Sequence, residues 1–382
     1  MRLKPTIVGA VAAVAILAGC STAPAADAGA PATLEVGGMF SMTGSLASYG
    51  EQQSRGIELA FEEINAAGGA AGTELKLNIE DIKSEPATAV TALNKLASVD
   101  KVPFTFISTS SVIAASAPVG DRAGVVMMNA GATAPTLAGL SDFLFSSVPL
   151  ENYHIENEAK YAFEELGIRT IGILHTDEAL GQSDADAMEA AWEAIGGEVV
   201  GRQSAEYTTT TFRPQLTLLD AQKPDAIYMA VGGQQIAIAL NQYTELGADA
   251  VVLGTSFWTV PEALEAARGI SKGVVFSTQR WNPEDPGTDE AKAFVDAFTA
   301  KYGVAPLGNS ATYYVAAHIL GDVIASLNES GTAITGDSIR ERMHEIGTFS
   351  TIFGDLTFAE DGTSIMPLSL LEIRDGQFVS ID

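Results

Sequence analysis

Apolar and polar positions alternate along the chain in two kinds of segment. Short, continuously apolar runs are typical of strands buried on both faces, and longer segments with apolar residues every three or four positions are typical of amphipathic helices. The predicted strands are 34–39, 74–79, 102–107, 125–129, 170–175, 198–203, 226–231 and 250–255. The predicted helices are 51–67, one opening at 84–86, one capped at 110–111, and then 151–166, 181–195 and 234–246. Because the alternation restarts after Pro149, it predicts an α/β fold with two doubly wound parallel sheets.

The last hundred residues follow a different pattern. Three helical segments come first, and a late set of strands follows, of which the last two are joined by a predicted hairpin turn at Asp375-Gly376. The helices are expected at 288–302, 310–328 and 336–346, and the strands at 356–358, 368–374 and 377–381.

The first 33 residues differ from the rest in composition. Arg2 and Lys4 precede an apolar run that ends at Leu17-Ala18-Gly19-Cys20. A basic start, about 10 apolar residues and small residues at the end are typical of a secretory signal too short to span a bilayer. The tetrapeptide resembles the lipobox of bacterial lipoproteins. That resemblance implies that residues 1–19 are removed and that Cys20 is lipidated, with 20–33 as a tether to a membrane face outside the cytoplasm. A cysteine of the folded core is the alternative.

Net charge and chain length reduce the number of functional classes that the chain can belong to. The 382 residues carry a formal net charge of −27 and a single cysteine, which leaves no partner for a disulfide within the chain. A chain this long is expected to form two domains. An acidic surface repels phosphate backbones, so the composition argues against a nucleic-acid partner.

Motifs of catalysis are missing from the sequence. It has no phosphate-binding Gly-x-x-x-x-Gly-Lys, no HExxH and no GxSxG, and its four histidines lack the spacing of metal ligands. We therefore expect a protein that is not an enzyme and that uses neither a cofactor nor a metal, although a dispersed hydrolase triad has no fixed spacing to test.

Four segments taken in order resemble a known family, and they extend that resemblance over residues 34–382. They are Phe40-Ser41-Met42-Thr43-Gly44 with Tyr49-Gly50, the helix from Gly56 to Asn65 with Ala67-Gly68-Gly69, Ser108-Thr109-Ser110-Ser111, and Ala130-Gly131-Ala132-Thr133-Ala134-Pro135. The chain resembles the periplasmic substrate-binding proteins of ABC importers, of the leucine/isoleucine/valine-binding type.

The resemblance implies two lobes that close on a ligand. One lobe would take 34–150 and 280–350, the other 151–279 and 351–382, with a hinge near Pro149, Thr278 and Thr351. It also implies a monomer that holds a small carboxylate-bearing solute and docks on separate permease and ATPase subunits. The default ligand is an apolar or aromatic amino acid. Presentation of ligand to a separate receptor is a second possibility.

A carboxylate site is expected on the first lobe. Ser110 and Ser111 stand where a strand ends and a helix begins, so free backbone N–H groups would point into the cleft. The resemblance implies that Thr109, Ser110 and Ser111 hold the carboxylate together with Ala132 and Thr133, and that Tyr49 lines the pocket. Alternatively, Ser110 caps its helix, Thr133 turns the chain and Tyr49 packs.

The second lobe departs from the family pattern. Leu180 and Gly232 stand where the family has aromatic residues, and the loop with Ser256, Phe257 and Trp258 lacks the acid that pairs with a ligand ammonium. A buried ammonium without a counter-charge is strongly disfavoured. Carboxylate recognition is thus expected to be kept, and ammonium recognition lost or moved.

Three replacements remain open at this point. Asp177 or Glu178 could supply the acid, or they could be an exposed helix start. Phe257, Trp258 or Trp281 could form an aromatic wall or a cation–π site, or the two tryptophans could pack at the hinge. Finally, the ligand could be a plain or aromatic carboxylate without an amine. His175 ends a strand near the same place, where a histidine satisfied by its neighbours is the commoner outcome.

Overall fold

The computed structural model describes residue 1 and residues 32–44, 46–279, 281–374 and 376–381. The predicted signal, Cys20 and most of the tether therefore lie outside the described residues, as does Asp375 of the predicted turn. Within the described ranges, no helix combines the length and the apolar character needed to cross a bilayer.

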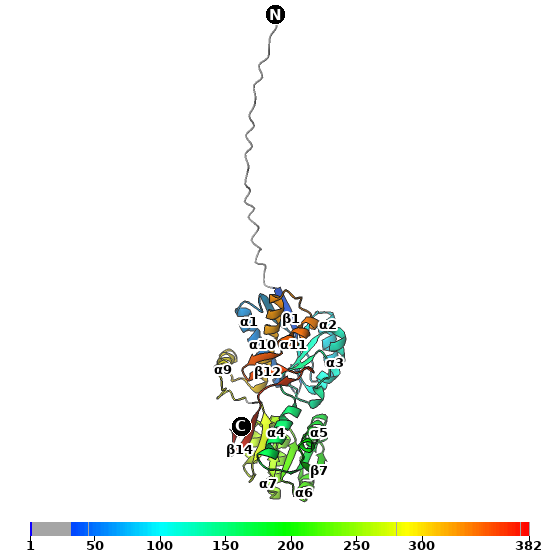
Figure 1. The fold of residues 1–382 in the computed structure, drawn as a ribbon, viewed down its shortest axis with the longest axis vertical. Coiled ribbons are helices and arrows are strands. Elements are labelled where there is room, and N and C mark those ends of the chain that lie inside the picture. The colour runs from blue at the N-terminus through cyan, green and yellow to red at the C-terminus, as the bar shows by residue number, and fades with distance from the viewer. Residues whose placement is uncertain (2–31, 45, 280, 375, 382) are drawn as a thin grey trace. The chain divides into compact units, whose positions relative to one another are not determined.

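The first sheet has five parallel strands in the order β2-β1-β3-β4-β5. Its apolar side chains alternate between two clusters: Phe104 and Phe106 face α1 and α10, and Ile107 faces α2 and α3. The strands are β1 (Ala32–Phe40), β2 (Thr73–Asp81), β3 (Phe104–Ile107), β4 (Val126–Asn129) and β5 (Leu144–Ser146). The helices are α1 (Ala47–Ala66), α2 (Pro86–Ser98), α3 (Ser110–Ala123), η1 (Pro135–Leu137), α9 (Asp289–Tyr302), α10 (Gly308–Glu329) and α11 (Gly336–Ile346). We call this part lobe 1 (Figure 1).

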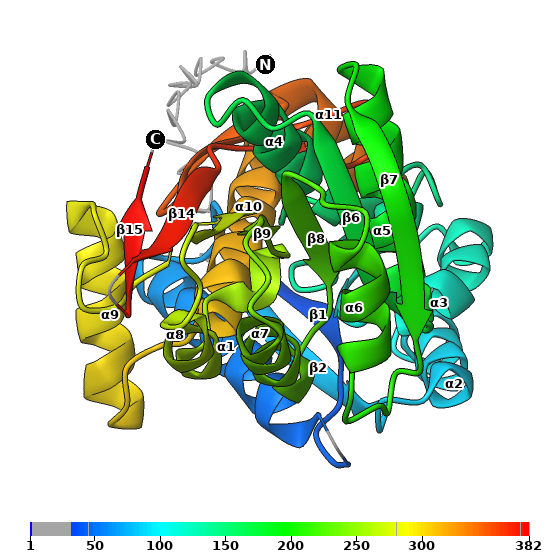
Figure 2. The ribbon, with the colours of Figure 1, turned by 90° about the horizontal axis from the view of Figure 1, so that it is seen from below.

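The second sheet has seven strands in the order β15-β14-β10-β9-β8-β6-β7, parallel except for the antiparallel edge formed by β14 and β15. Figure 2 looks onto this part, lobe 2, and shows α6, α7 and α8 on one side of the sheet and α4 on the other. The strands are β6 (Thr170–Thr176), β7 (Glu198–Ala205), β8 (Ala226–Ala230), β9 (Val251–Leu253), β10 (Val274–Thr278), β14 (Ser369–Arg374) and β15 (Gln377–Ser380). The helices are α4 (Glu151–Glu164), α5 (Ala179–Ala194), α6 (Arg213–Asp220), α7 (Gln234–Leu246), η2 (Ser256–Trp258) and α8 (Pro261–Ala267).

Both sheets are covered by helices on their two faces, and the side chains of each strand point alternately to one face and the other. In β8, Ala226 and Tyr228 enter the cluster with α4 and α5, while Ile227 and Met229 enter the cluster with α6, α7 and α8. The predicted α/β class with two doubly wound sheets is thus confirmed.

A third, antiparallel sheet corrects the expected lobe boundary at residue 351. Its strands are β11 (Thr348–Thr351), β12 (Gly354–Phe358) and β13 (Ser364–Ile365). Leu356, Phe358 and Met366 are buried in the same cluster as α1 and α10, so residues 351–366 pack on lobe 1. The chain changes lobe only between Met366 and Ser369. The apolar pattern of a strand predicts that the strand is buried, but it does not indicate which lobe buries it. The sequence therefore could not place this boundary.

The start of the fold also differs slightly from expectation. Ala32 and Thr33, which fall in the predicted tether, already pair with Thr73 and Glu74 as part of β1. Near the first crossing between the lobes, the Tyr153 hydroxyl lies 3.1 Å from Thr363 Oγ1, which joins α4 to the loop before β13.

Candidate functional site

A cleft of about 900 Å³ separates the two lobes. Its walls contain residues that follow the carboxyl ends of strands in both sheets: Gly131 after β4, Gly232 after β8 and Thr255 after β9. In open α/β sheets, ligands bind at this end of the strands. A smaller cavity of about 270 Å³ shares Tyr49, Gly131 and Phe257 with the cleft. We therefore treat the two cavities as one site.

Asn129 shapes the loop that forms the lobe 1 wall. Its side-chain oxygen accepts hydrogen bonds from the N–H groups of Gly131 (3.1 Å) and Ala132 (2.8 Å), and its amide nitrogen donates to the Ala132 carbonyl (2.7 Å). Because of these bonds, both the N–H and the carbonyl of Ala132 are occupied within the loop, and the residue is 5% exposed. This is not the free backbone donor expected at Ala132. Gly131, which the sequence reading did not single out, lines both cavities instead.

Thr133 is the polar side chain of this loop that lacks a partner. It lines the cleft, and its Oγ1 is buried without a hydrogen bond. Its carbonyl accepts a 2.7 Å hydrogen bond from the N–H of Glu151, the first residue of α4. The loop is therefore held in place from behind while one hydroxyl remains available to a ligand.

The start of α3 adds backbone donors. Thr109 is the N-cap residue, at φ 72°, and no side chain caps the first turn. A non-glycine residue at positive φ stores strain, which concentrates at functional sites. Ser108 and Thr109 line the smaller cavity, whereas Ser111 is exposed and neither Ser110 nor Ser111 lines either cavity. The residues near the helix start that line the site are thus Ser108 and Thr109, not the expected Ser110 and Ser111.

Apolar groups of lobe 2 face the same space. Leu180 lines the cleft and packs against a lobe 1 cluster that includes Ala132 and Leu137. Gly232 leaves open space, since an added Cβ would meet nothing within 4 Å. Phe257, which is 37% exposed, lines both cavities. These groups make an apolar surface opposite the hydroxyl of Thr133.

Two acids of α5 also line the cleft. Glu178 is the N-cap of the helix, where its Oε1 accepts a 3.2 Å hydrogen bond from Gly181 N and its Oε2 is buried without a partner. Asp184 is 2% exposed, and its Oδ1 is likewise buried without a partner. Burial, reinforced by the charges of Glu151 and Glu178, raises the pKa of Asp184 to about 9. The sequence reading missed Asp184 because it lies inside a helix rather than in a loop.

Two further buried acids stabilise the wall from behind. Glu151 accepts hydrogen bonds from the N–H (2.9 Å) and the hydroxyl (2.6 Å) of Ser256, and Glu158 accepts from Gly254 N (3.1 Å). Burial raises the pKa of Glu151 to about 7 against the opposing effect of those two bonds, and burial holds the pKa of Glu158 well above its ordinary value. Ser256 therefore lines the cleft, but its donors are already occupied.

Two candidates for the site, Trp258 and Asp177, have structural roles instead, and His175 is satisfied by its neighbours as the sequence favoured. Trp258 is fully buried in the lobe 2 core, where its Nε1 donates to the Val231 carbonyl at 3.0 Å. Asp177 is exposed and accepts a 2.8 Å hydrogen bond from Tyr207 N. His175 is buried, with Nδ1 2.9 Å from the Thr176 carbonyl and Nε2 accepting from Arg202.

Trp281 both borders the cleft and has a structural role. It lines the cleft, but its Nε1 donates to the Pro306 carbonyl at 3.3 Å and its ring packs against Phe294 and Phe353 of lobe 1. It therefore offers an edge of a packed ring rather than a free aromatic wall. His154 also lines the cleft, and burial lowers its pKa to about 3, which leaves its ring neutral.

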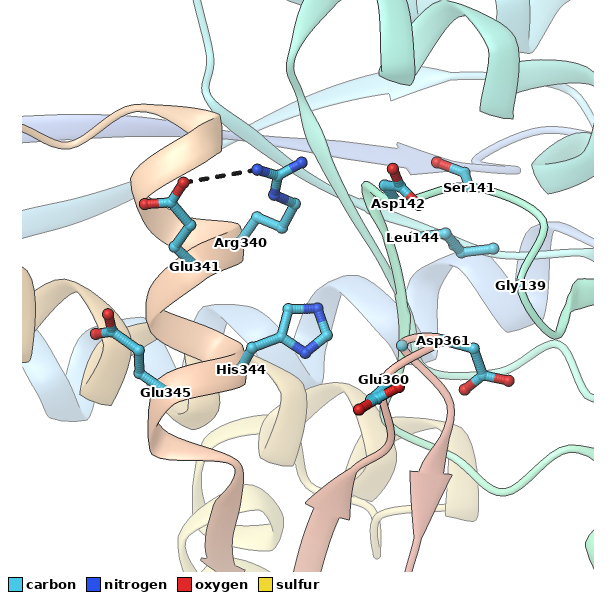
Figure 3. Close-up of a pocket in the computed structure, with 11 residues that line it drawn as sticks. Gly139, Ser141, Asp142, Leu144, Arg340, Glu341, His344, Glu345, Glu360 and Asp361 are labelled. Atoms are coloured by element: carbon cyan, nitrogen blue, oxygen red, sulfur yellow. Dashed lines mark ion pairs between the residues drawn. The ribbon is translucent and has the colours of Figure 1, made fainter.

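A separate hollow of about 460 Å³ lies in lobe 1 (Figure 3). Arg340 and His344 project from α11 toward the loops that carry Asp142 and Asp361, and both pack on phenylalanine rings. None of its described lining side chains has a buried polar atom without a partner. The described residues also contain no group of three or more His, Cys, Asp or Glu side chains that could hold a metal ion. The interlobe cleft is therefore the better candidate for ligand binding.

Comparisons with known proteins agree with this geometry. A family model described as "Periplasmic binding protein" matches residues 33–377. The Leu/Ile/Val-binding protein BraC3 of Rhizobium johnstonii is 26% identical over 365 residues, which cover 92% of this chain and 95% of that protein.

Solved structures share the fold at lower identity. One is the substrate-binding protein of a branched-chain amino acid transporter from Streptococcus pneumoniae in complex with isoleucine, with a TM-score of 0.73, 24% identity and coverage of 91% and 99%. Another is a solute-binding protein of an ABC transporter from Rhodopseudomonas palustris in complex with 3,4-dihydroxybenzoic acid, with a TM-score of 0.71, 22% identity and coverage of 91% and 96%.

Proposed function

The chain belongs to the periplasmic binding protein family, and we propose that it is the solute-binding protein of an ABC importer. In this role it binds a small carboxylate-bearing solute, an apolar or aromatic amino acid, in the interlobe cleft. The permease and ATPase subunits are separate proteins, and this chain performs no catalysis. The relatives named above, a Leu/Ile/Val-binding protein among them, support this function.

The observation that carries the proposal is the unpartnered hydroxyl of Thr133 in the cleft, together with the uncapped start of α3 at the smaller cavity that adjoins it. A ligand carboxylate would accept hydrogen bonds from this hydroxyl and from backbone N–H groups of the helix start, as anions do at helix N-termini. Leu180 and Phe257 would contact the apolar part of the solute.

The location follows from the sequence and the family together. We propose that residues 1–19 are removed, that Cys20 carries the lipid, and that the folded body lies outside the cytoplasm as a monomer. Mass spectrometry of the mature protein tests this directly. A diacylated N-terminal Cys20 is the expected result, and an intact residue 1 would contradict it.

A second candidate ligand is an aromatic or aliphatic acid without an amine. Phe257 and the apolar Leu180 favour it, as does the relative that binds 3,4-dihydroxybenzoic acid. In either case the same protein could present its ligand to a separate receptor instead of a permease. A neighbouring permease gene would favour transport, and a neighbouring kinase or chemoreceptor gene would favour sensing.

A thermal-shift screen of residues 21–382 tests the proposed function. Leucine, phenylalanine, benzoate, short aliphatic acids and carboxylate-free amines form the panel. A carboxylate ligand at about 100 times its dissociation constant adds about 2.7 kcal/mol to the stability, an upward shift of a few degrees.

The screen is repeated with Thr133→Val, which removes the hydroxyl and keeps the shape. We expect it to weaken carboxylate binding by about 1–3 kcal/mol, the value of a charge-assisted hydrogen bond. Ser111→Ala, on the exposed side of the same helix start, is the matched control and should bind normally. Unchanged affinity in Thr133→Val would contradict the carboxylate site.

A further inference from the structure

We propose that the solute carries an ammonium group and that the carboxylate of Asp184, with Glu178 beside it, receives that group on the lobe 2 wall. The inference rests on the proposed function and deepens it, because it distinguishes an amino acid from an amine-free acid. Neither Asp184 nor Glu178 lies in the loop after β9, where the family pattern has its acid; Glu178 was one of the alternatives that the sequence left open, and Asp184 was not.

The first step is that Asp184 faces the site rather than the core. It lines the cleft and is 2% exposed, and its Oδ1 has no hydrogen-bond partner. A carboxyl buried without a partner costs several kcal/mol unless a cation or hydrogen-bond donors reach it. A chain that keeps an acid here without internal compensation indicates a ligand that supplies the compensation.

The second step is the arrangement of the two acids on one helix face. Glu178, Gly181 and Asp184 are spaced by three residues, so they lie along the same side of α5. Gly181 lets this side of α5 pack closely on the end of β6, because an added Cβ would lie 2.5 Å from Thr176 Oγ1 and 3.1 Å from Glu178 Oε2. The unpartnered Oε2 of Glu178 and Oδ1 of Asp184 lie on either side of this close contact, and both residues line the cleft.

The third step concerns the remaining charges near Asp184. The groups whose charges act on Asp184 are acidic or neutral: Glu178 at the start of its own helix, Glu151 on α4 and Tyr228 on β8. Two other residues of α4 add no positive charge, since Glu158 is acidic and His154, which lines the cleft, is neutral. Glu151 and Glu158 are engaged by donors of the 254–256 loop, and the Tyr228 hydroxyl is buried without a partner. A primary ammonium offers three N–H donors and one positive charge, which this surrounding lacks.

The two walls then fix the direction of the solute. Its carboxylate would lie toward Thr133 and the start of α3, and its ammonium toward Asp184. Because burial and the nearby carboxylates raise the pKa of Asp184, the empty site holds a proton at neutral pH. Binding of an ammonium favours the ionised carboxylate, so it should release that proton.

Isothermal titration calorimetry with matched ligands tests the inference on the soluble body, residues 21–382. The pairs are leucine against 2-hydroxy-4-methylpentanoate and phenylalanine against 3-phenyllactate, with 3-methylbutylamine as the amine that has no carboxylate. We expect binding of the amino acid and strong discrimination against its hydroxy acid. Titrations in two buffers of different ionisation enthalpy should show release of close to one proton.

Asp184→Asn should lower amino-acid affinity about 30-fold or more, as expected when one partner of a buried charge pair is removed. It should also abolish the proton release and narrow the preference over the hydroxy acid. The melting temperature of the empty variant should not fall, because a buried acid has been removed, whereas a purely structural role would lower it. Asp186→Asn is the matched control, since Asp186 is exposed on the same helix and pairs with Arg202 at 2.7 Å.

Each outcome decides a different claim. Equal binding of hydroxy acid and amino acid, with no effect of Asp184→Asn, would overturn the inference and leave the proposed function standing. Binding of 3-methylbutylamine as tight as leucine, unaffected by Thr133→Val, would support the ammonium site and overturn the carboxylate site. Failure of every probe to bind would overturn both.

Discussion

The two walls of the cleft differ in the charge of the groups that line them. The lobe 1 wall is neutral: Asn129 satisfies the loop from behind, and a single hydroxyl, that of Thr133, is left unpartnered. The lobe 2 wall is acidic, since Glu178 and the buried Asp184 line the cleft and two more buried carboxyl groups, those of Glu151 and Glu158, hold the 254–256 loop. Neutral N–H and O–H donors suit an anion, and unpaired carboxyl groups suit a cation. This difference is what the proposed amino acid, a solute with one end of each sign, requires.

The largest expected effect separates two adjacent aromatic residues of the lobe 2 wall. Trp258 fills the core under the wall, and Gly254 accommodates it, because an added Cβ would lie 2.6 Å from the ring. Trp258→Ala should lower the free energy of unfolding by about 3–5 kcal/mol. Phe257→Ala, at an exposed position, should change it by less than about 0.5 kcal/mol and weaken ligand binding instead.

Urea denaturation and calorimetry of the two variants make this measurement. Similar losses of stability in both would show that the loop is a single packed unit. The distinction between a binding surface and its support would then be lost.

The next effect is the response to pH, which should come from lobe 2. Asp184 has a raised pKa, so it is protonated in the folded protein and ionised in the unfolded chain between about pH 4 and 9. Stability should therefore fall as pH rises through that window, by at most about 1.4 kcal/mol per pH unit for one proton. His154 acts in the opposite direction, but only between its lowered pKa of about 3 and its ordinary value, so pH 7.0 to 8.5 is the window to use.

Urea midpoints of the empty protein at pH 7.0 and 8.5 check this expectation, with Asp184→Asn as the comparison. The variant should show a flatter dependence than the natural chain. Equal slopes would mean that Asp184 is already ionised, and the contrast between the two walls would be smaller than the structure indicates.

The smallest effect concerns Asp177, an exposed acid of the same region that does not line the cleft. It accepts one hydrogen bond from Tyr207 N in an exposed loop. Asp177→Asn should cost less than about 1 kcal/mol of stability and leave amino-acid affinity unchanged. A loss of affinity comparable to that of Asp184→Asn would move the ammonium site toward Asp177 and blur the assignment within lobe 2.

The sequence indicates the Thr133 loop of lobe 1 more clearly than it indicates the contacts that support the lobe 2 wall, for a physical reason. The Thr133 loop is local: its supporting residue, Asn129, is four positions away, and a strand exit followed by Gly-Ala-Thr can be recognised as a unit. In lobe 2 the supporting contact joins Glu151 to Ser256, 105 residues apart, and the sequence carries no mark of it. The elements themselves followed the apolar pattern closely, since both sheets bury two faces.

Asp184 illustrates what remained beyond the sequence. An acid inside an amphipathic helix normally faces solvent, and only the packing of α5 shows that this one is 2% exposed. The spacing of Glu178, Gly181 and Asp184 places two acids and a small residue on one side of the helix, and the sequence shows this. It does not show which side of the helix borders the cleft, so the spacing alone did not identify the site.

The contact between the Thr133 carbonyl and Glu151 N has a mechanical consequence. The side chain of the same Glu151 accepts hydrogen bonds from Ser256. Both walls are therefore hydrogen-bonded to one residue, which lies beside the first crossing between the lobes. If one lobe rotates against the other about this point, displacement grows with distance from the pivot. The Thr133 loop and Ser256, both hydrogen-bonded to Glu151, would then keep their spacing, and groups farther from Glu151 would move more.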